Sequence, residues 1–472
     1  MKEIVGVILA AGEGKRMRSK HPKVLHPLWG KPMVEYVLDA CQRLPLAKIF
    51  LVIGHQAERV KEALAQRNIY FVLQREQKGS GHALMQVGPQ LKGFSGNLLV
   101  VCGDIPLISE EILRNLLAVH LKVNAAATLL TTHLDDPTGY GRVIREKTGK
   151  LKGIVEEVDA NDRQKGIQEV NTGIYCFAAP ELFAALKVIR SSNRQGEYYL
   201  PDVFSFLRER GLKVEISSTP DSEKVMGINS RGELARALSI LQRRKLEELM
   251  KQGVTLLDPA STFIDPVCQI GKDTVIYPHI CIEGETVIGE DCILYPGSRI
   301  VASRIGDGVT LFDHCLILES EIQDGSRVGP FAHLRPQSQI GKGARIGNFV
   351  EIKKSVIGEG SKAPHLSYIG DSVIGRKVNI GAGSITCNYD GYEKHRTQVE
   401  DGVFVGSNTL FIAPVSVGEG AMIAAGSVIT EDVPPHALAI ARAPQANKEG
   451  WAKSWHERKA RKKAASPGKG RR

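Results

Sequence analysis

The sequence predicts an α/β protein in which a mostly parallel sheet with helices is followed by a parallel β-helix. Two periodicities carry this prediction. In the first half, short apolar runs alternate with helical patterns, and in the second half an aliphatic residue returns every six positions. A length of 472 residues is sufficient for two or three domains with ample core.

Residues 1–228 have the pattern of repeated βαβ units. Strands are expected at residues 4–9, 49–53, 70–73, 98–102 and 126–131, and helices at residues 33–41, 57–65, 81–87 and 110–121. Such alternation favours a mostly parallel sheet. Ligands of these sheets bind at the carboxyl ends of the strands. The region therefore predicts one ligand-binding α/β domain.

A connecting helix is expected next, within residues 229–252, because residues 231–251 are rich in Ala, Leu, Arg and Glu and Gly253 follows. The six-residue pattern occupies residues 253–447. It runs from Ile264 to Ile300, resumes at Ile305 and returns from Val405 to Ile429. Neither a helix nor a simple strand has this period. It is typical of a parallel β-helix, in which each flat side takes six residues and points one side chain inward.

The pattern has one long interruption. Thr386 and Val405 are 19 positions apart, which is not a multiple of six. Residues 387–395 are polar and turn-prone, so we expect them to loop out of a coil. Loops on rigid scaffolds often carry function.

The net charge of +10 is concentrated at the C-terminus, since residues 451–472 hold nine Lys or Arg and one Glu. Residues 448–472 are therefore expected to form a basic, disordered, solvated tail, and contact with nucleic acid or anionic lipid is the less favoured alternative. The sequence has no apolar run of about 18 residues, so it predicts no membrane span. The eight cysteines form no Cys-x-x-Cys pair, which favours reduced thiols in a cytoplasm over zinc or disulfides.

The first predicted strand runs into a glycine-rich loop, Leu9-Ala10-Ala11-Gly12-Glu13-Gly14-Lys15-Arg16-Met17, with Lys23 shortly after. Small residues let backbone N–H groups approach a phosphate, and cations neutralise it. The loop is neither a dinucleotide fingerprint nor a Walker loop, and a simple tight turn is the alternative. Asp104 ends a buried strand, where a carboxylate is well placed to hold Mg²⁺.

These segments resemble the sugar nucleotidyltransferases. The shared motifs are Leu-Ala-Ala-Gly-x-Gly-x-Arg-Met with Pro22-Lys23, Gln74, Gly79-Ser80-Gly81-His82-Ala83, Gly139-Tyr140-Gly141-Arg142, Ile154-Val155-Glu156-Glu157, Asn171-Thr172-Gly173 and Gly227-Ile228-Asn229. With its hexapeptide half, the chain closely resembles the bacterial bifunctional N-acetylglucosamine-1-phosphate uridyltransferase and glucosamine-1-phosphate acetyltransferase family, over residues 3 to about 451. The resemblance implies a Rossmann-like nucleotidyltransferase domain and a left-handed β-helix. It also implies UTP and acetyl-CoA as substrates, Mg²⁺, a cytoplasmic homotrimer, and no specific nucleic-acid partner.

The resemblance also implies roles in the first domain. Uridylyl and sugar binding would fall to Leu9, Ala10, Ala11, Gly12, Lys23, Gln74, Gly79, Ser80, Gly141, Glu156, Asn171 and Asn229. Arg16 and Lys23 would face the phosphates as catalytic cations, and Asp104 and Asn229 would hold the metal. Ser80 stands where the family usually has Thr, and Cys102 stands where some members have Tyr.

In the β-helix, the segment Lys362-Ala363-Pro364-His365-Leu366-Ser367-Tyr368 resembles the family's acetyl-transfer motif. His365 would be the general base, because imidazole suits proton removal near neutral pH. The amino-sugar phosphate would contact Arg335, Lys353, Tyr368 and Asn379. Acetyl-CoA would contact Ala382, Asn388, Tyr389, Ser407, Ala425 and Arg442.

The resemblance thus implies an enzyme that acetylates glucosamine 1-phosphate and then transfers uridylyl from UTP, supplying UDP-N-acetylglucosamine for peptidoglycan and lipopolysaccharide. Two alternatives remain. One is a monofunctional nucleotidyltransferase whose β-helix only oligomerises or regulates. The other is a non-catalytic scaffold. The motif around His365 speaks against the first, and intact Arg16, Lys23, Asp104 and Asn229 speak against the second.

Overall fold

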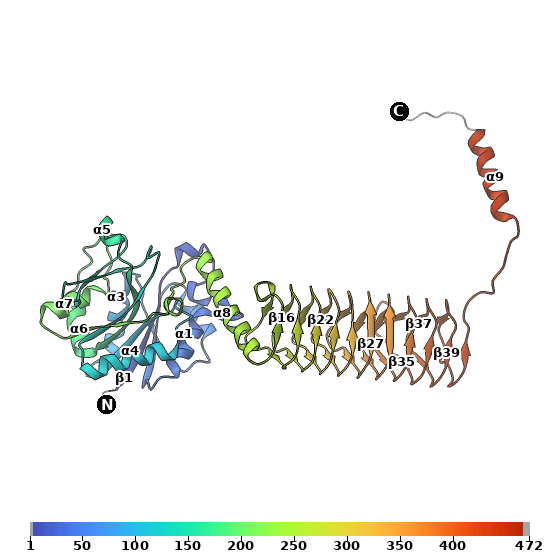
Figure 1. Cartoon of the computed structure of the whole chain (residues 1–472), viewed down its shortest axis with the longest axis horizontal. Helices are drawn as coiled ribbons and strands as arrows, with labels where there is room; N and C mark the ends of the chain where they lie inside the picture. The colour runs from blue at the N-terminus through green and yellow to red at the C-terminus, as the bar shows by residue number, and fades with distance from the viewer. Residues whose placement is uncertain (1–2, 466–472) are drawn as a thin grey trace. The chain divides into compact units, whose positions relative to one another are not determined.

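The computed structural model describes residues 3–465 and divides the chain into two compact units, residues 1–244 and residues from 245 onward (Figure 1). The division falls inside helix α8 (Arg231–Lys251). Leu234 and Ala237 of this helix pack in the first unit, while Leu246 and Leu249 pack in the second. The predicted connecting helix is therefore present.

The first unit is built on one sheet with the strand order β11-β7-β10-β6-β1-β4-β5. The strands are β1 (Ile4–Ala10), β4 (Lys48–Ile53), β5 (Tyr70–Leu73), β6 (Asn97–Cys102), β7 (Ala127–His133), β10 (Glu169–Ala178) and β11 (Val214–Ser218), with β8 (Arg142–Arg145) and β9 (Leu151–Val155) paired at its side. Strand β1 pairs in parallel with β4 and β6, whereas β10 runs antiparallel between β6 and β7. The expected strands and the mostly parallel sheet are confirmed.

Helices cover both faces of this sheet, which explains why central strands such as β1 and β6 are apolar on both sides rather than alternating. They are α1 (Met33–Gln42), α2 (Ala57–Ala63), α3 (Ser80–Met85), α4 (Glu110–Val123), α5 (Asp162–Lys165), α6 (Ala179–Leu186) and α7 (Asp202–Glu209). Ile8 belongs to the cluster that includes Leu38 and Leu113, from α1 and α4. Its neighbour Val7 belongs to the opposite cluster, with Leu84 of α3. The buried sheet leaves the carboxyl ends of β1 and β6 free to form a site.

The second unit is a parallel β-helix of three sheets. They contain 11 strands, from β12 (Thr255–Leu256) to β41 (Leu438–Ala439), 10 strands, from β13 (Phe263–Ile264) to β40 (Val428–Ile429), and nine strands, from β14 (Gln269–Ile270) to β38 (Val415–Val417). Gln269 lies opposite Val287, and Val287 lies opposite Arg304, so one coil takes 18 residues and the next takes 17. The six-residue period therefore shortens to five at some corners, such as Ile300 to Ile305.

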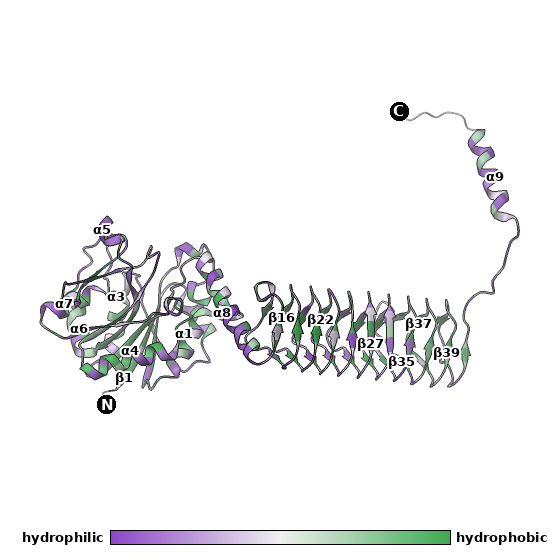
Figure 2. Cartoon of the chain, in the orientation of Figure 1, coloured by the Kyte–Doolittle hydropathy of each residue, from purple (hydrophilic) through white to green (hydrophobic). Residues whose placement is uncertain are grey.

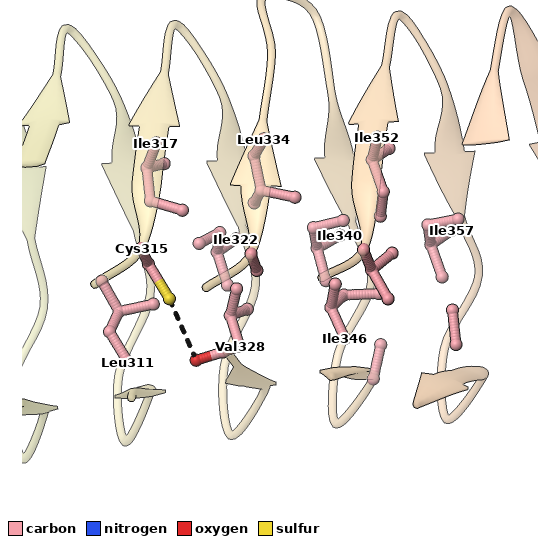
Figure 3. Packing of buried hydrophobic residues seen from close by; sticks show 14 of the residues in the cluster. Leu311, Cys315, Ile317, Ile322, Val328, Leu334, Ile340, Ile346, Ile352 and Ile357 are labelled. Carbon is pink, nitrogen blue, oxygen red and sulfur yellow. Dashed lines mark hydrogen bonds between the residues drawn. The ribbon is translucent and has the colours of Figure 1, made fainter. Parts of the chain in front are cut away.

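The aliphatic residues of the repeat form a continuous column inside the prism (Figure 3). Leu334 and Ile340 are fully buried, and most strands add one such side chain, although β34 points Thr386 inward instead. Small polar residues also lie inside, and their hydroxyls bond to backbone carbonyls of the next coil, as from Thr274 to Gly289 at 2.9 Å. In Figure 2 green, hydrophobic residues recur along these coils among hydrophilic ones. The column stabilises the prism and holds its outer faces rigid.

The predicted loop leaves the prism between β34 (Ile385–Cys387) and β35 (Thr397–Val399). Ser372 lies opposite Thr397, so this coil takes 25 residues instead of 17 or 18. A bridge between Tyr389 and Lys394 closes the loop, and Tyr392 is 94% exposed. The expectation that residues 387–395 loop out is confirmed.

The C-terminal segment differs from the expected disorder, because Trp451–Ala464 form helix α9. Ala, Lys, Arg and Glu are strong helix formers and predominate here, which a charge-based argument overlooks. None of its residues is buried. The rest of the predicted tail, residues 466–472, lies outside the described residues. Over the described part of the chain, every helix is too short or too polar to cross a membrane.

Candidate active sites

A cavity of about 440 Å³ opens at the carboxyl ends of β1 and β6 in the first unit. It brings together nine residues predicted to bind the nucleotide, the sugar or the metal: Leu9, Ala10, Ala11, Gly12, Lys23, Gln74, Gly79, Ser80 and Asp104. Parallel strands end at one edge of the sheet, so the loops that follow them converge there. The geometry agrees with the predicted grouping of these residues.

The ammonium of Lys23 lies between two oxygen ligands. It forms an ion pair with Asp104 and donates a hydrogen bond to Asn229 Oδ1 at 2.6 Å. The backbone N–H of Ile228 donates to Asp104 O at 2.8 Å, and Glu233 of α8 accepts from the Asn229 N–H at 2.7 Å. These bonds fix both oxygens around one cation position. A carboxylate and an amide oxygen suit Mg²⁺, which usually takes its remaining ligands from phosphates and water.

The start of α3 forms another wall of the cavity. Gly79 has φ +97°, and a Cβ there would approach Tyr198 O to 2.7 Å, so only glycine fits. Ser80 accepts a hydrogen bond from the Leu200 N–H at 3.0 Å, and Gln74 donates to Gly79 O at 3.1 Å. The hydroxyl of Ser80 thus anchors a neighbouring segment.

Gly141, Glu156 and Asn171 lie side by side near this cavity. Gly141 O accepts from the Asn171 N–H at 2.8 Å, and a Cβ at Gly141 would lie 3.1 Å from Glu156 Oε1. Cys102, which lines the cavity, has its Sγ 3.4 Å from Gly173 O, two residues beyond Asn171. The predicted sugar contacts therefore adjoin the nucleotide cavity through Cys102.

Burial raises the pKa of Glu156, and together with a smaller effect of the nearby carboxylates of Asp202 and Asp159 it brings this pKa from its ordinary value of 4.5 to about 7. A carboxyl that binds its proton more tightly in the folded state stabilises the fold below its unfolded pKa. That stability is lost as pH rises through the folded pKa. We expect the free energy of unfolding of the first unit to fall between about pH 4.5 and pH 7, and Glu156→Gln to remove most of this fall.

Trp29 provides the measurement, since the other two tryptophans, Trp451 and Trp455, lie in α9. In a background with both of these replaced by Phe, urea unfolding followed by Trp29 fluorescence is compared at pH 5 and pH 8. The comparison is made for the chain that keeps Glu156 and for its Glu156→Gln variant. Equal pH dependence in the two proteins would contradict the prediction.

Five predicted site residues of the first unit do not line the cavity, namely Arg16, Gly141, Glu156, Asn171 and Asn229. Arg16 is exposed in the short helix η1 (Lys15–Met17), whereas its neighbour Lys15 lines the cavity. Sequence reasoning missed Lys15, Gln77 and Glu197 as lining residues. Lys15 could have been predicted, because it lies in the glycine-rich loop. Glu197 could not, because it is distant in sequence from every predicted motif.

On the β-helix, His365 lines a second cavity of about 370 Å³. Its Nδ1 lies 2.6 Å from Oδ1 of Asn348, which is opposite His365 on the preceding coil. An amide oxygen only accepts, so Nδ1 is the protonated nitrogen and Nε2 keeps its lone pair. Asn348 was missed, although the 17-residue coil length would have placed it beside His365.

Two predicted sugar-phosphate residues, Arg335 and Lys353, lie at the neighbouring sheet. Arg335 forms an ion pair with Glu351 at 2.9 Å, and Lys353 lies 3.7 Å from Asp371. Asn388 of the projecting loop also contacts Asp371 through its side chain. One carboxylate thus joins a predicted phosphate ligand to the loop.

The remaining predicted acetyl-transfer residues lie on successive coils of the β-helix. Tyr368 lies with its hydroxyl over Gly370, where a Cβ would be 2.5 Å away, and Asn379 lies opposite Lys362. At a corner, Ala382 O accepts from Asn408 N and Ser407 O accepts from Gly426 N, next to Ala425. Arg442 Cδ comes within 3.8 Å of a Cβ built on Gly426. The predicted acetyl-CoA residues Ala382, Ser407, Ala425 and Arg442 are therefore brought together, whereas Tyr389 is 60% exposed on the loop.

Comparison with known proteins assigns both units. The MobA-like NTP transferase domain matches residues 6–188, and the bacterial transferase hexapeptide model of six repeats matches residues 319–354 and 396–431. The bifunctional protein GlmU of Geobacillus sp. strain WCH70 is 51% identical over 445 residues, which are 94% of this chain and 96% of the relative. Those of Listeria monocytogenes serotype 4a and Geotalea uraniireducens are 50% and 47% identical, over 96% of this chain and 99% of each relative.

Relatives of this kind span both units, and their likeness to this chain far exceeds what fold alone produces. The hexapeptide match identifies the β-helix as left-handed. The chain therefore belongs to the family of bifunctional GlmU proteins, and it is an enzyme that carries a uridylyltransferase domain and an acetyltransferase domain of left-handed β-helix fold.

Proposed function

We propose that the β-helix site acetylates glucosamine 1-phosphate with acetyl-CoA, and that the first site then transfers uridylyl from UTP to the product with Mg²⁺. The observation that supports this most is the presence of two separate cavities in one chain. One is lined by Lys23 and Asp104, with Asn229 hydrogen-bonded to Lys23, and the other is lined by His365 and Asn348, which contact each other.

In uridylyl transfer, an oxygen of the sugar 1-phosphate attacks the α-phosphorus of UTP and pyrophosphate leaves. Asp104 and Asn229 would hold Mg²⁺, which, when bound, neutralises charge on the phosphoryl oxygens. Lys23 is nearly buried, and when its oxygen partners bind the metal it becomes free to contact a phosphate. Arg16, exposed on the loop, would reach the phosphates from outside. This chemistry needs positioning and charge, not a covalent protein group.

In acetyl transfer, Nε2 of His365 would remove a proton from the amine of the sugar as its nitrogen attacks the thioester carbon. The tetrahedral intermediate would then break its C–S bond, and the thiolate of CoA would leave and take up a proton to give the free thiol. Asn348 keeps the lone pair on Nε2 by accepting the Nδ1 proton. Arg335 and Lys353 would bind the sugar phosphate when their ion pairs with Glu351 and Asp371 open. Tyr368, Asn379, Asn388 and Tyr389 would position the amino sugar and the thioester end of acetyl-CoA.

The test supplies the pure protein with glucosamine 1-phosphate, acetyl-CoA, UTP and Mg²⁺, and follows free thiol and pyrophosphate separately. We expect thiol release without UTP, and pyrophosphate release only after acetylation. Pyrophosphate release from ready-made N-acetylglucosamine 1-phosphate without any thiol release would favour the monofunctional alternative. The eight free cysteines suit a reducing cytoplasm, which is the compartment we propose.

The full chain should be a homotrimer, and acetylation should depend on it. A three-sided prism can pack one flat side around a threefold axis, which closes the assembly. Tyr389 and Tyr392 project from the loop with 60% and 94% exposure, which suits contact with a neighbouring copy. Light scattering should give three chains per particle, and a shortened chain ending near Arg244, where the first unit ends, should keep uridylyl transfer without this trimer. A full-length monomer with full acetyltransferase activity would contradict the arrangement.

A further inference from the structure

Three cations stand in a row on one outer face of the β-helix. Arg327 of β24 (Arg327–Val328) lies opposite Arg345 of β27 (Arg345–Asn348), which lies opposite Lys362 of β30 (Lys362–His365). All three side chains are exposed. Neighbouring strands lie about 4.8 Å apart, so the cations repel one another at short range. Such a row is destabilising unless an anion binds to it.

The row has no carboxylate to neutralise it. Within residues 3–465, none of the three cations forms an ion pair with Asp or Glu. Two other outward cations on the prism have a carboxylate beside them, since Arg299 forms an ion pair with Glu283 and Arg304 lies opposite Glu321. By contrast, the row places cations opposite one another on three successive coils, which leaves this face positively charged.

The three cations line the same 370 Å³ cavity as His365 and Asn348. The guanidinium of Arg327 lies 5.2 Å from the centre of the Phe312 ring, which holds it beside the cavity. On the following coil the row continues from Lys362 to Asn379, a predicted substrate contact. Lys362 and His365 are three residues apart on one strand, which places the row about 10 Å from the imidazole.

We propose that Arg327, Arg345 and Lys362 form a phosphate-binding site that holds a phosphorylated group of a reactant of acetyl transfer. This inference rests on the acetyl transfer proposed above. Guanidinium groups bind phosphate oxygens in pairs, and a row of three positive charges suits a dianion or a diphosphate. The phosphate has two possible sources. Because the 1-phosphate of the amino sugar is already assigned to Arg335 and Lys353, the diphosphate and 3′-phosphate of acetyl-CoA are the favoured source, and the 1-phosphate is the alternative that the test distinguishes.

The test compares the full-length chain with the double variant Arg327→Gln/Arg345→Gln. Thiol release is measured while one substrate is varied and the other is saturating. Arg299→Gln/Arg304→Gln is the matched control, because it removes the same charge from outward positions of the same prism. Uridylyl transfer in each preparation shows that the protein is folded.

We expect the KM of one reactant to rise about tenfold or more in the double variant, with kcat nearly unchanged, because binding rather than chemistry is lost. A rise for glucosamine 1-phosphate identifies the sugar phosphate as the ligand, and a rise for acetyl-CoA identifies the coenzyme. The KM of the wild type should also increase more steeply with salt than that of the variant.

If both KM values match those of the control variant, or if kcat alone falls, the phosphate site is refuted while acetyl transfer stands. If the wild type releases no thiol at all, the proposed acetyl transfer fails instead. The two failures are therefore distinguishable.

Discussion

Replacing His365 with Ala should lower acetyl transfer by about 10²–10⁴-fold and leave the reaction of N-acetylglucosamine 1-phosphate with UTP intact. The imidazole is the basic group in the β-helix cavity that has an oriented lone pair, since its Nδ1 is 2.6 Å from Asn348 Oδ1. Thiol release and pyrophosphate release from one preparation measure both activities. Because His365 is exposed, its loss should not unfold the prism.

His333 is the matched control for this variant. It lies on an outer face of the same prism, opposite Glu351, and its Nε2 has no hydrogen-bond partner among the described residues. His333→Ala should therefore acetylate far faster than His365→Ala. Near-normal acetyl transfer in His365→Ala would place the base elsewhere, and His333 would then be the next candidate.

Asn348→Ala should lower acetyl transfer less than His365→Ala, and it should change the pH profile of kcat. Without the amide oxygen, nothing selects the tautomer that leaves Nε2 free. A pH profile identical to that of the wild type would mean that Asn348 only packs against the ring.

Much of the fold follows from period alone. The six-residue repeat predicts a column with one aliphatic residue per flat side, and Leu334, Ile340 and Ile352 occupy it as expected. The long loop follows from the 19-residue gap. Coils of 17 residues leave only a small trace in the sequence, such as the five-residue step from Ile300 to Ile305, because a corner tolerates one residue fewer without moving the inward side chain.

Some site residues can be predicted from the sequence and others cannot. Residues next to each other in the glycine-rich loop, such as Ala11 and Gly12, are predictable because the loop itself forms the cavity wall. The contact of Lys23 with Asn229 spans 206 positions, and only the chain's path through β6 and α8 creates it. Helix α9 is not predicted, because the net charge of its segment suggests disorder, whereas the helix propensity of Ala, Lys and Arg favours a helix.

Asp104→Ala should lower uridylyl transfer by at least about 100-fold and spare acetylation. Even loss of an outer-shell partner costs a metal site about 10–100-fold, and Asp104 is proposed as a direct ligand. The substitution also leaves the ammonium of Lys23, which is 9% exposed, with Asn229 as its remaining oxygen partner in the site. Pyrophosphate release measured across a range of Mg²⁺ concentrations, beside thiol release, gives both readouts.

Asp104→Asn distinguishes metal binding from structure in this experiment. It keeps an oxygen ligand and the shape of the side chain but removes the negative charge, so the Mg²⁺ concentration for half-maximal rate should rise while the fold is kept. Asp162→Ala, at an exposed position in the same domain, should behave as the wild type. A parallel fall of thiol release in Asp104→Ala would mean that the two activities share one site. An unchanged Mg²⁺ dependence in Asp104→Asn would remove Asp104 from the metal site and leave it as the partner that holds Lys23 in place.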